Sequence, residues 1–133
     1  MAAYYARRAE AGAGLIVTEG TVIHASGDGY RDVPYIETAA HAAAWRPIVE
    51  RVHAAGSRML CQLWHCGRIS HADFTGGEPP VSSTDRPAEG MNRQNNKPFG
   101  TPHALTPCEM PAVHAHFAEA ARQALAAGFD GVE

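Results

Sequence analysis

The sequence predicts an α/β fold, a partial (β/α)8 TIM barrel with about three consecutive β/α units of the eight. Three observations predict this fold class. An alanine-rich helical stretch, a glycine and a short apolar run follow one another three times along the 133 residues. The apolar runs lack strict polar alternation, as do strands that are buried on both faces of a parallel sheet. Each helix returns to its strand through a short connection, whereas each strand leaves through a long segment.

The three units follow one another in chain order. The helices are expected within residues 2–14, 39–56 and 108–128, and the strands at residues 15–19, 58–63 and 129–132. In the second and third helices apolar side chains recur every three or four positions, so each helix has one apolar stripe to lay on a sheet. The stripes are Trp45, Ile48, Val49 and Val52 in the second helix, and Val113, Phe117, Ala120, Ala121 and Ala124 in the third.

The helix boundaries carry their own signals. Thr106 and Glu109 have the spacing of a capping box, with Pro107 at the first helical position, where proline is favoured. Gly56 and Gly128 follow the last helical residues, where a left-handed residue ends a helix. These signals predict where the third helix begins and where the second and third helices end.

Composition and charge exclude several classes of partner. The net charge is −3 and the 11 Lys and Arg residues are scattered, so no nucleic-acid partner and no anionic membrane surface is expected. No apolar run approaches the roughly 20 residues of a membrane span. Three cysteines without a secretory signal favour a cytoplasmic protein.

The length predicts that the barrel is incomplete. A complete barrel of this type has eight strands and about 250 residues. Three strands leave two open edges, which are an aggregation hazard unless another chain covers them. The sequence also stops within a predicted strand, at residues 132–133. We therefore expect residues 1–133 to be one incomplete barrel domain, and an oligomer or a complementing chain is possible.

Functional side chains are expected where the strands end, because β/α barrels build their active sites from the loops at the carboxyl ends of the strands. Gln62 lies at such an end and opens the distinctive stretch Gln62–Arg68. Its amide both donates and accepts, which matches the pyrimidine edge of a flavin or a nucleobase. The alternative is that Gln62 pairs with neighbouring backbone, as buried polar side chains mostly do.

The first strand ends at a second candidate, Gly20. A glycine lets a planar ring approach the backbone and leaves its N–H unscreened, although a simple turn glycine is the alternative. Tyr30 lies in the following loop, where an aromatic side chain could wall a cleft or instead fold back on the surface.

No metal site is expected from the eight histidines. His114 and His116 point to different sides of their helix, and a loop separates His65 from His71, so no established ligand spacing is present. Cys61 and Cys66 lack the spacing of a redox motif and are expected to be inert. The glycines at residues 12–14 precede a strand, whereas a dinucleotide-binding turn follows one.

Taken in order, these stretches resemble the old yellow enzyme family of FMN-dependent ene-reductases and NADH:flavin oxidoreductases. The resemblance covers almost the whole chain, and the order and spacing of its pieces make it specific. The pieces are Tyr4-Tyr5 to Arg8-Ala9, Gly14 to Thr21, Gly29-Tyr30 with Pro34, Trp45, Val52 to Ala54, Gln62 to His65 with Gly67-Arg68 and Ser70-His71, Pro80-Val81, Leu105-Thr106, Ala120 to Arg122, and Ala127 to Glu133.

The resemblance implies an FMN-dependent oxidoreductase that uses NADH or NADPH to reduce activated alkenes, the α,β-unsaturated carbonyl compounds. Gly20 would offer its main chain beside the pyrimidine carbonyl of the flavin, and Gln62 would bind the pyrimidine edge. Tyr30 and Trp64 match positions that line the substrate cleft and would shape substrate choice. No catalytic residue is expected within this chain.

Several family features have no counterpart in the 133 residues. The first strand, the substrate-binding His-x-x-His or His-x-x-Asn pair, the proton-donating tyrosine and the phosphate-binding loops would all lie outside them. The chain alone is therefore expected to be inactive and to bind FMN weakly or not at all. Tyr35 stands where relatives commonly have glycine, and residues 91–97 do not align.

Two alternatives to a flavin enzyme are a non-catalytic module that assembles with a partner chain, and a barrel enzyme that uses a metal.

Overall fold

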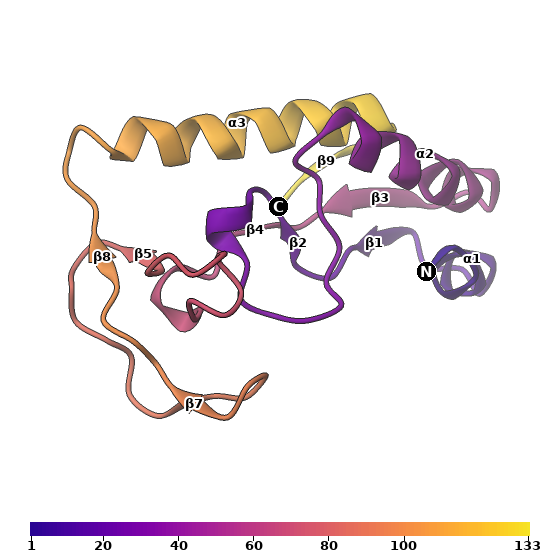
Figure 1. The fold of residues 1–133 in the computed structure, drawn as a ribbon. Coiled ribbons are helices and arrows are strands. Elements are labelled where there is room, and N and C mark those ends of the chain that lie inside the picture. The colour runs from indigo at the N-terminus through magenta and orange to yellow at the C-terminus, as the bar shows by residue number, and fades with distance from the viewer.

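A three-stranded parallel sheet with helices packed on one side forms the centre of the molecule (Figure 1). The computed structural model describes all residues from Met1 to Glu133. The elements are α1 (Ala2–Glu10), β1 (Leu15–Val17), β2 (Thr21–Val22), η1 (Ala25–Gly27), α2 (Ala39–Ala54), β3 (Arg58–Cys61), β4 (Leu63–Trp64), η2 (Gly67–Ile69), β5 (Val81–Ser82), β6 (Met91–Asn92), β7 (Lys97–Pro98), β8 (His103–Ala104), α3 (Met110–Ala127) and β9 (Gly131–Val132). The sheet order is β1, β3, β9, and α2 contacts both α1 and α3. The three predicted helix–strand units are confirmed.

A bulge separates the sheet from a short continuation. Beyond β1 and β3, the strands β2 and β4 form a second parallel pair. Val17 pairs with Leu60 and Thr21 pairs with Leu63. Four positions separate the first residues of these pairs and three separate the second, so the segment between β1 and β2 carries one extra residue. The predicted strand at residues 15–19 therefore ends earlier than expected, and Thr21, predicted as loop, is strand.

The core lies between the sheet and the three helices. Its buried members are Tyr5, Ala9, Ile16, Ile23, Ile36, Ala42, Trp45, Val49, Val52, Met59, Cys61, Ala120, Ala124, Ala127 and Phe129. The Trp45 ring packs against Phe129 and Tyr5, with ring centroids 5.3 and 6.3 Å apart, and so joins two of the helices to the end of the sheet at β9. The predicted stripe of α2 is confirmed.

The stripe of α3 is buried only in its second half. Ala120 and Ala124 are inaccessible, whereas Phe117 is 37% exposed. The reason is that the first half of α3 extends past the sheet toward β8 (Figure 1). No helix of the structure is both long enough and apolar enough to span a membrane.

The helix ends follow the sequence signals in part. Gly56 and Gly128 have φ of 85° and 97°, the left-handed conformation predicted for them. The predicted start of the third helix is wrong, because Pro107 was expected as its first residue and α3 begins three residues later, at Met110. The carboxylate of Glu109 does accept the Thr106 N–H at 2.7 Å, but the Thr106 hydroxyl donates to the same carboxylate. With its hydroxyl engaged in this way, Thr106 does not cap the helix.

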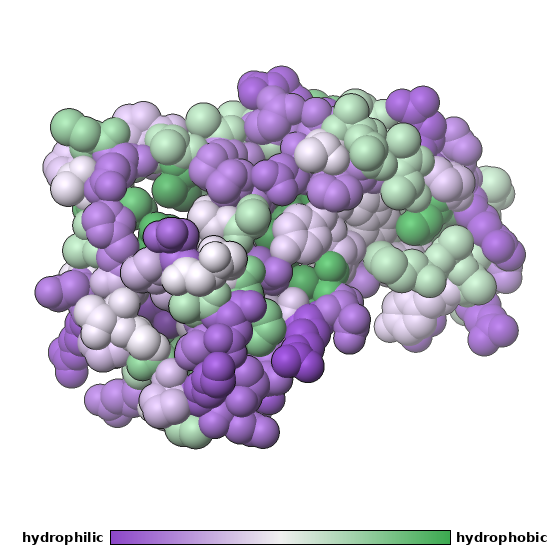
Figure 2. Space-filling model, viewed as in Figure 1, coloured by the Kyte–Doolittle hydropathy of each residue, from purple (hydrophilic) through white to green (hydrophobic).

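The predicted long loop between His65 and Leu105 contains four short strands. β5 pairs with β8 in parallel, and β6 pairs with β7 in an antiparallel hairpin that includes the unaligned residues 91–97. Figure 2 shows that the surface of this excursion is mostly hydrophilic. We call residues 65–105 the excursion.

An ionic cluster ties the amino ends of β3 and β9 together. The Asp130 carboxylate accepts hydrogen bonds from the Arg58 side chain at 2.6 Å, the Met59 N–H at 2.8 Å and the His53 ring at 2.8 Å. These donors hold the pKa of Asp130 well below its usual range, with the Arg58 hydrogen bond as the largest cause. The cluster lies at the end of the sheet opposite the candidate site.

The face of the sheet opposite the helices is open. Leu15 and Val17 are 54% and 42% exposed, whereas Ile16 between them is buried under the helices. The expected burial on both faces is therefore absent, since only one face of the sheet is covered by the chain.

Candidate functional site

The two predicted site segments lie side by side at the carboxyl ends of β1 and β3. The Thr21 N–H donates to the Gln62 carbonyl at 2.8 Å, and the Gln62 N–H donates to the Thr18 hydroxyl at 2.9 Å. The Thr18 hydroxyl in turn donates to the Glu19 carbonyl at 2.8 Å. A side-chain hydroxyl thus replaces a backbone acceptor at the bulge, and the main chain of Gln62 is fixed on both sides.

The side chain of Gln62 is free of the rest of the chain. Cys61 is buried on the helix side, so Gln62 projects from the opposite face of the strand. The side chain is half-buried, and its amide makes no hydrogen bond within the chain. The local backbone pairing considered for Gln62 is therefore not seen. A half-buried amide that is held by its own strand and lacks a partner suits a planar ligand with an adjacent donor and acceptor.

Gly20 lies directly under the ring of Trp64. A Cβ atom on Gly20 would lie 2.5 Å from Cδ2 of Trp64 and closer still to Cε3, which is far inside van der Waals contact. The planar ring that approaches this glycine is thus supplied by the chain itself. The N–H of Gly20 makes no hydrogen bond within the chain and remains available as a donor.

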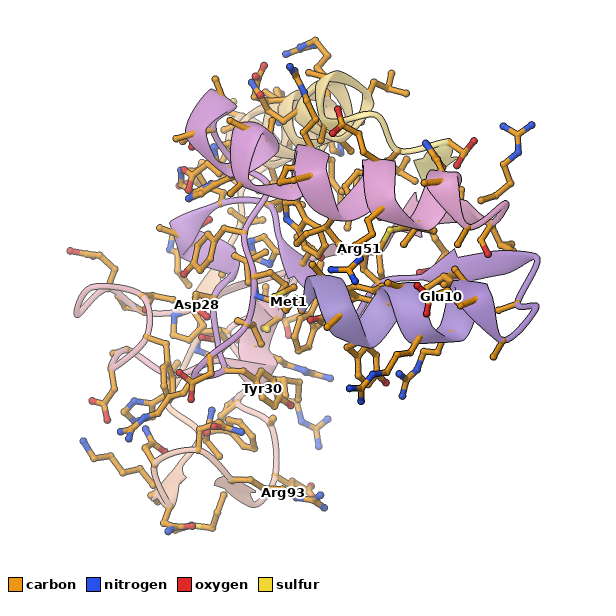
Figure 3. All side chains as sticks on the ribbon, turned by 90° about the vertical axis from the view of Figure 1, so that its right-hand side faces the viewer. Met1, Glu10, Asp28, Tyr30, Arg51 and Arg93 are labelled. Atoms are coloured by element: carbon orange, nitrogen blue, oxygen red, sulfur yellow. The ribbon has the colours of Figure 1, made fainter.

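Tyr30 completes an aromatic pair with Trp64. The two ring centroids are 5.0 Å apart, with the planes inclined by 34°. Tyr30 also lines a cleft of about 440 Å³ together with Ile69 and residues of the β6–β7 hairpin, among them Arg93. Figure 3 shows Tyr30 between Asp28 and Arg93, on the excursion side of the molecule and away from Glu10. The structure therefore brings Gly20, Trp64 and Tyr30 together.

Sequence reasoning missed one polar contact at this end of the sheet. The buried Tyr5 of α1 donates its hydroxyl to the carboxylate of Glu19, at the bulge. Both residues line an open groove of about 580 Å³ beside β1. The available signal was a tyrosine within an otherwise alanine-rich buried face, because a buried tyrosine hydroxyl needs a partner.

The cysteines near the site are not activated as nucleophiles. Burial raises the pKa of Cys61 to about 11 and that of Cys66 to about 12. Both thiols stay protonated at neutral pH and therefore lack the reactive thiolate form.

Three histidines meet where α3 extends past the sheet. The rings of His24 and His116 are stacked with centroids 3.6 Å apart and planes inclined by 7°. His65 Nδ1 accepts the Gly67 N–H at 3.1 Å, while His65 Nε2 and His116 Nδ1 are buried without a partner. Burial, then the neighbouring histidines, lower the pKa of His65 and His116, and Glu37 opposes this for His116. No group of three or more such side chains is arranged to hold a metal ion.

This histidine cluster predicts a loss of stability on acidification. Because the folded pKa values of His65 and His116 are lowered, the unfolded chain takes up protons first as the pH falls through about 6.5. The free energy of unfolding is then highest above about pH 7 and falls below it, by at most about 1.4 kcal/mol per pH unit for each histidine. Urea unfolding between about pH 5.5 and 8 measures this slope.

His116→Phe keeps a flat ring against His24 and removes one titrating group, so the slope should become shallower. His114→Phe, at an exposed position of the same helix, is the matched control and should leave the slope unchanged. Equal slopes in the unmodified chain and the His116→Phe variant would contradict the assignment.

Comparisons with known proteins agree with this geometry. A family model described as the NADH:flavin oxidoreductase / NADH oxidase family matches residues 1–133. A putative 12-oxophytodienoate reductase-like protein of Arabidopsis thaliana is 43% identical over 130 residues, which cover 98% of this chain and 48% of the relative. The old yellow enzyme homologue from Zymomonas mobilis superposes with a TM-score of 0.91 at 41% identity, over 98% of this chain and 37% of that chain. Morphinone reductase in complex with tetrahydroNAD gives a TM-score of 0.90 at 39% identity, over 98% of this chain and 38% of that chain.

The chain thus spans less than half the length of these relatives. Its structural neighbours are old yellow enzymes with the TIM-barrel fold, so the predicted fold class and the resemblance are both confirmed. FMN is the cofactor of the matched family, with NADH or NADPH as the reductant.

Proposed function

This chain belongs to the NADH:flavin oxidoreductase / NADH oxidase family, and we propose that residues 1–133 form one rim of an FMN site in an enzyme that reduces activated alkenes. The single observation that carries the proposal is the unpartnered amide of Gln62 at the carboxyl end of β3. On this proposal, residues 1–133 are an incomplete FMN-binding barrel domain, and further strands complete the barrel.

The residues present fit the flavin on chemical grounds. The Gln62 amide offers a donor and an acceptor to the N–H and C=O groups of the pyrimidine edge. The free N–H of Gly20 lies in the bulge between β1 and β2, beside the segment that carries Gln62, and suits a pyrimidine carbonyl. Neither group must break a hydrogen bond of its own to bind, so binding costs no hydrogen bond within the chain.

The bound flavin supplies the redox chemistry, which is hydride transfer from NADH or NADPH to an activated alkene, and the chain supplies orientation. Gln62 and Gly20 hold one edge of the ring in place. Trp64 and Tyr30 form an aromatic wall beside them and shape the substrate cleft. The raised pKa values of Cys61 and Cys66 make both nearby thiols weak acids, and no proton donor is assigned to these residues.

A chimera tests the proposal. In it, these 133 residues replace the aligned segment of the Zymomonas mobilis old yellow enzyme homologue, which is feasible at 41% identity and a TM-score of 0.91. We expect the chimera to bind FMN tightly and to oxidise NADH in the presence of 2-cyclohexenone. The 133-residue chain alone should bind FMN more weakly than micromolar, because the resemblance implies that the phosphate-binding loops lie outside these residues.

Fluorescence quenching of FMN measures both affinities. Micromolar or tighter binding by the chain alone would refute the claim that these residues supply only part of the FMN site and the rest of the barrel supplies the remainder. A chimera that folds cooperatively but binds no FMN would refute the proposed site and favour the alternative, a non-catalytic segment that assembles with a partner chain.

A further inference from the structure

We propose that Tyr35 is a positioning residue, whose hydroxyl clamps Asp28 and thereby holds Tyr30 against Trp64 as a preformed wall of the substrate cleft. The inference rests on the proposed function only in treating the cleft as a substrate site. The hydrogen bonds of the clamp are independent of it.

The clamp begins with a short hydrogen bond. The Tyr35 hydroxyl donates to Oδ2 of Asp28 at 2.5 Å, across seven positions of the loop. Burial, followed by this hydrogen bond and the charge of Asp28, raises the pKa of Tyr35 far above its usual range. The hydroxyl therefore keeps its proton and remains a donor at every physiological pH.

The second carboxylate oxygen of Asp28 transmits this constraint to Tyr30. Asp28 Oδ1 accepts the N–H of Gly29 at 2.7 Å and the N–H of Tyr30 at 3.3 Å. The carbonyl of Asp28 also accepts the hydroxyl of the buried Ser70. One carboxylate thus joins the Tyr35 hydroxyl to the backbone that carries the Tyr30 ring.

Tyr35 is itself fixed to the core. Its carbonyl accepts the indole N–H of Trp45 at 3.1 Å, and its backbone forms a bridge with Val22 beside β2. Val22 and Trp45 are both buried. The clamp therefore connects a rigid anchor on α2 and β2 to the loop that carries Tyr30.

The cleft side of this connection is the Tyr30–Trp64 pair. Trp64 lies against Gly20 on one side, and its ring centroid lies 5.0 Å from that of Tyr30. A glycine at position 35 would have no side chain to reach Asp28. The loop would then lose this link to the core, and the aromatic wall would be free to open.

Fluorine NMR of the full chain labelled with 5-fluorotryptophan tests the clamp. The chain has two tryptophans, so two resonances are expected, and the Trp64→Phe variant assigns them. Tyr30→Leu removes the neighbouring ring and gives the reference position for Trp64 without its partner. In Tyr35→Phe, the Trp64 resonance should move at least half of the way toward that reference or broaden, while the Trp45 resonance keeps its position.

Tyr4→Phe is the matched control, because Tyr4 is 56% exposed and its hydroxyl has no partner. It should leave both resonances in place. If Tyr35→Phe lowers the melting temperature but leaves the Trp64 resonance unmoved, Tyr35 is merely structural and the proposal is overturned. This readout needs no flavin, so failure of the clamp is distinguishable from failure of the FMN site, which the chimera tests separately.

Discussion

Gly20→Val is expected to destabilise the chain by about 1–3 kcal/mol and to displace the indole of Trp64 from the end of β1. A Cβ atom at this position would lie 2.5 Å from Cδ2 of the Trp64 ring, and the two further methyl carbons of valine have no free space in that direction. The ring must rotate away, which also breaks its contact with Tyr30. Urea unfolding measures the change in free energy, and the fluorine resonance of Trp64 reports the displacement.

Gly14→Val is the matched control. Gly14 precedes the same strand, a Cβ atom added to it would meet no other atom within 4 Å, and its backbone does not adopt a left-handed conformation. A change of less than about 0.5 kcal/mol is expected there. If valine were equally well tolerated at both glycines, the close contact between Gly20 and Trp64 would be wrong.

Gln62→Leu is expected to weaken FMN binding by the chimera by about 10- to 100-fold, while leaving its fold intact. Leucine is close to glutamine in size but cannot pair with the pyrimidine edge, so two hydrogen bonds are lost, each contributing about 0.5–1.5 kcal/mol. The unfolding free energy should change little, because the Gln62 amide makes no hydrogen bond within the chain. Titration of FMN fluorescence measures the affinity.

Gln123→Leu provides the matched control for this loss. Gln123 lies on α3, where its amide binds Glu119 at 2.6 Å, and it is remote from the strand ends. The control should keep the FMN affinity of the unmodified chimera. Equal affinity in the Gln62→Leu variant would remove Gln62 from the flavin site.

The helix–strand units could be predicted because their signals are local. The stripe that contains Trp45 and Val49 has the helical period, and Gly56 and Gly128 mark helix ends through a backbone conformation that favours glycine. The proximity of Gly20 and Gln62 could be predicted from the parallel arrangement of the strands alone, because the carboxyl ends of parallel strands meet at one edge of a sheet.

The remaining features depend on register and tertiary contact. The bulge after Val17 arises from pairing between strands more than forty positions apart, and no residue type within it indicates that the strand contains an extra residue. The contact of Trp64 with Gly20 follows from that register. The stack of His24 on His116 depends on how far α3 extends past the sheet, which a periodic apolar stripe does not reveal.

The local signal at Thr106 was misleading for a physical reason. The spacing of Thr106 and Glu109 fits a capping box, but the Glu109 carboxylate takes both the N–H and the hydroxyl of Thr106. These bonds lower the pKa of Glu109 to about 2 and stabilise a turn ahead of the helix. The same two residues thus stabilise a turn at the position where the helix was expected to begin.

The most direct test of the central claim is a crystal structure of the chimera with FMN bound. The claim is that residues 1–133 supply one rim of the flavin site through Gln62 and Gly20. The predicted result places the Gln62 amide within about 3 Å of the donor and acceptor of the pyrimidine edge, with the Gly20 N–H toward a pyrimidine carbonyl. A bound flavin whose pyrimidine edge faces other residues, with the Gln62 amide still unpaired, would contradict it.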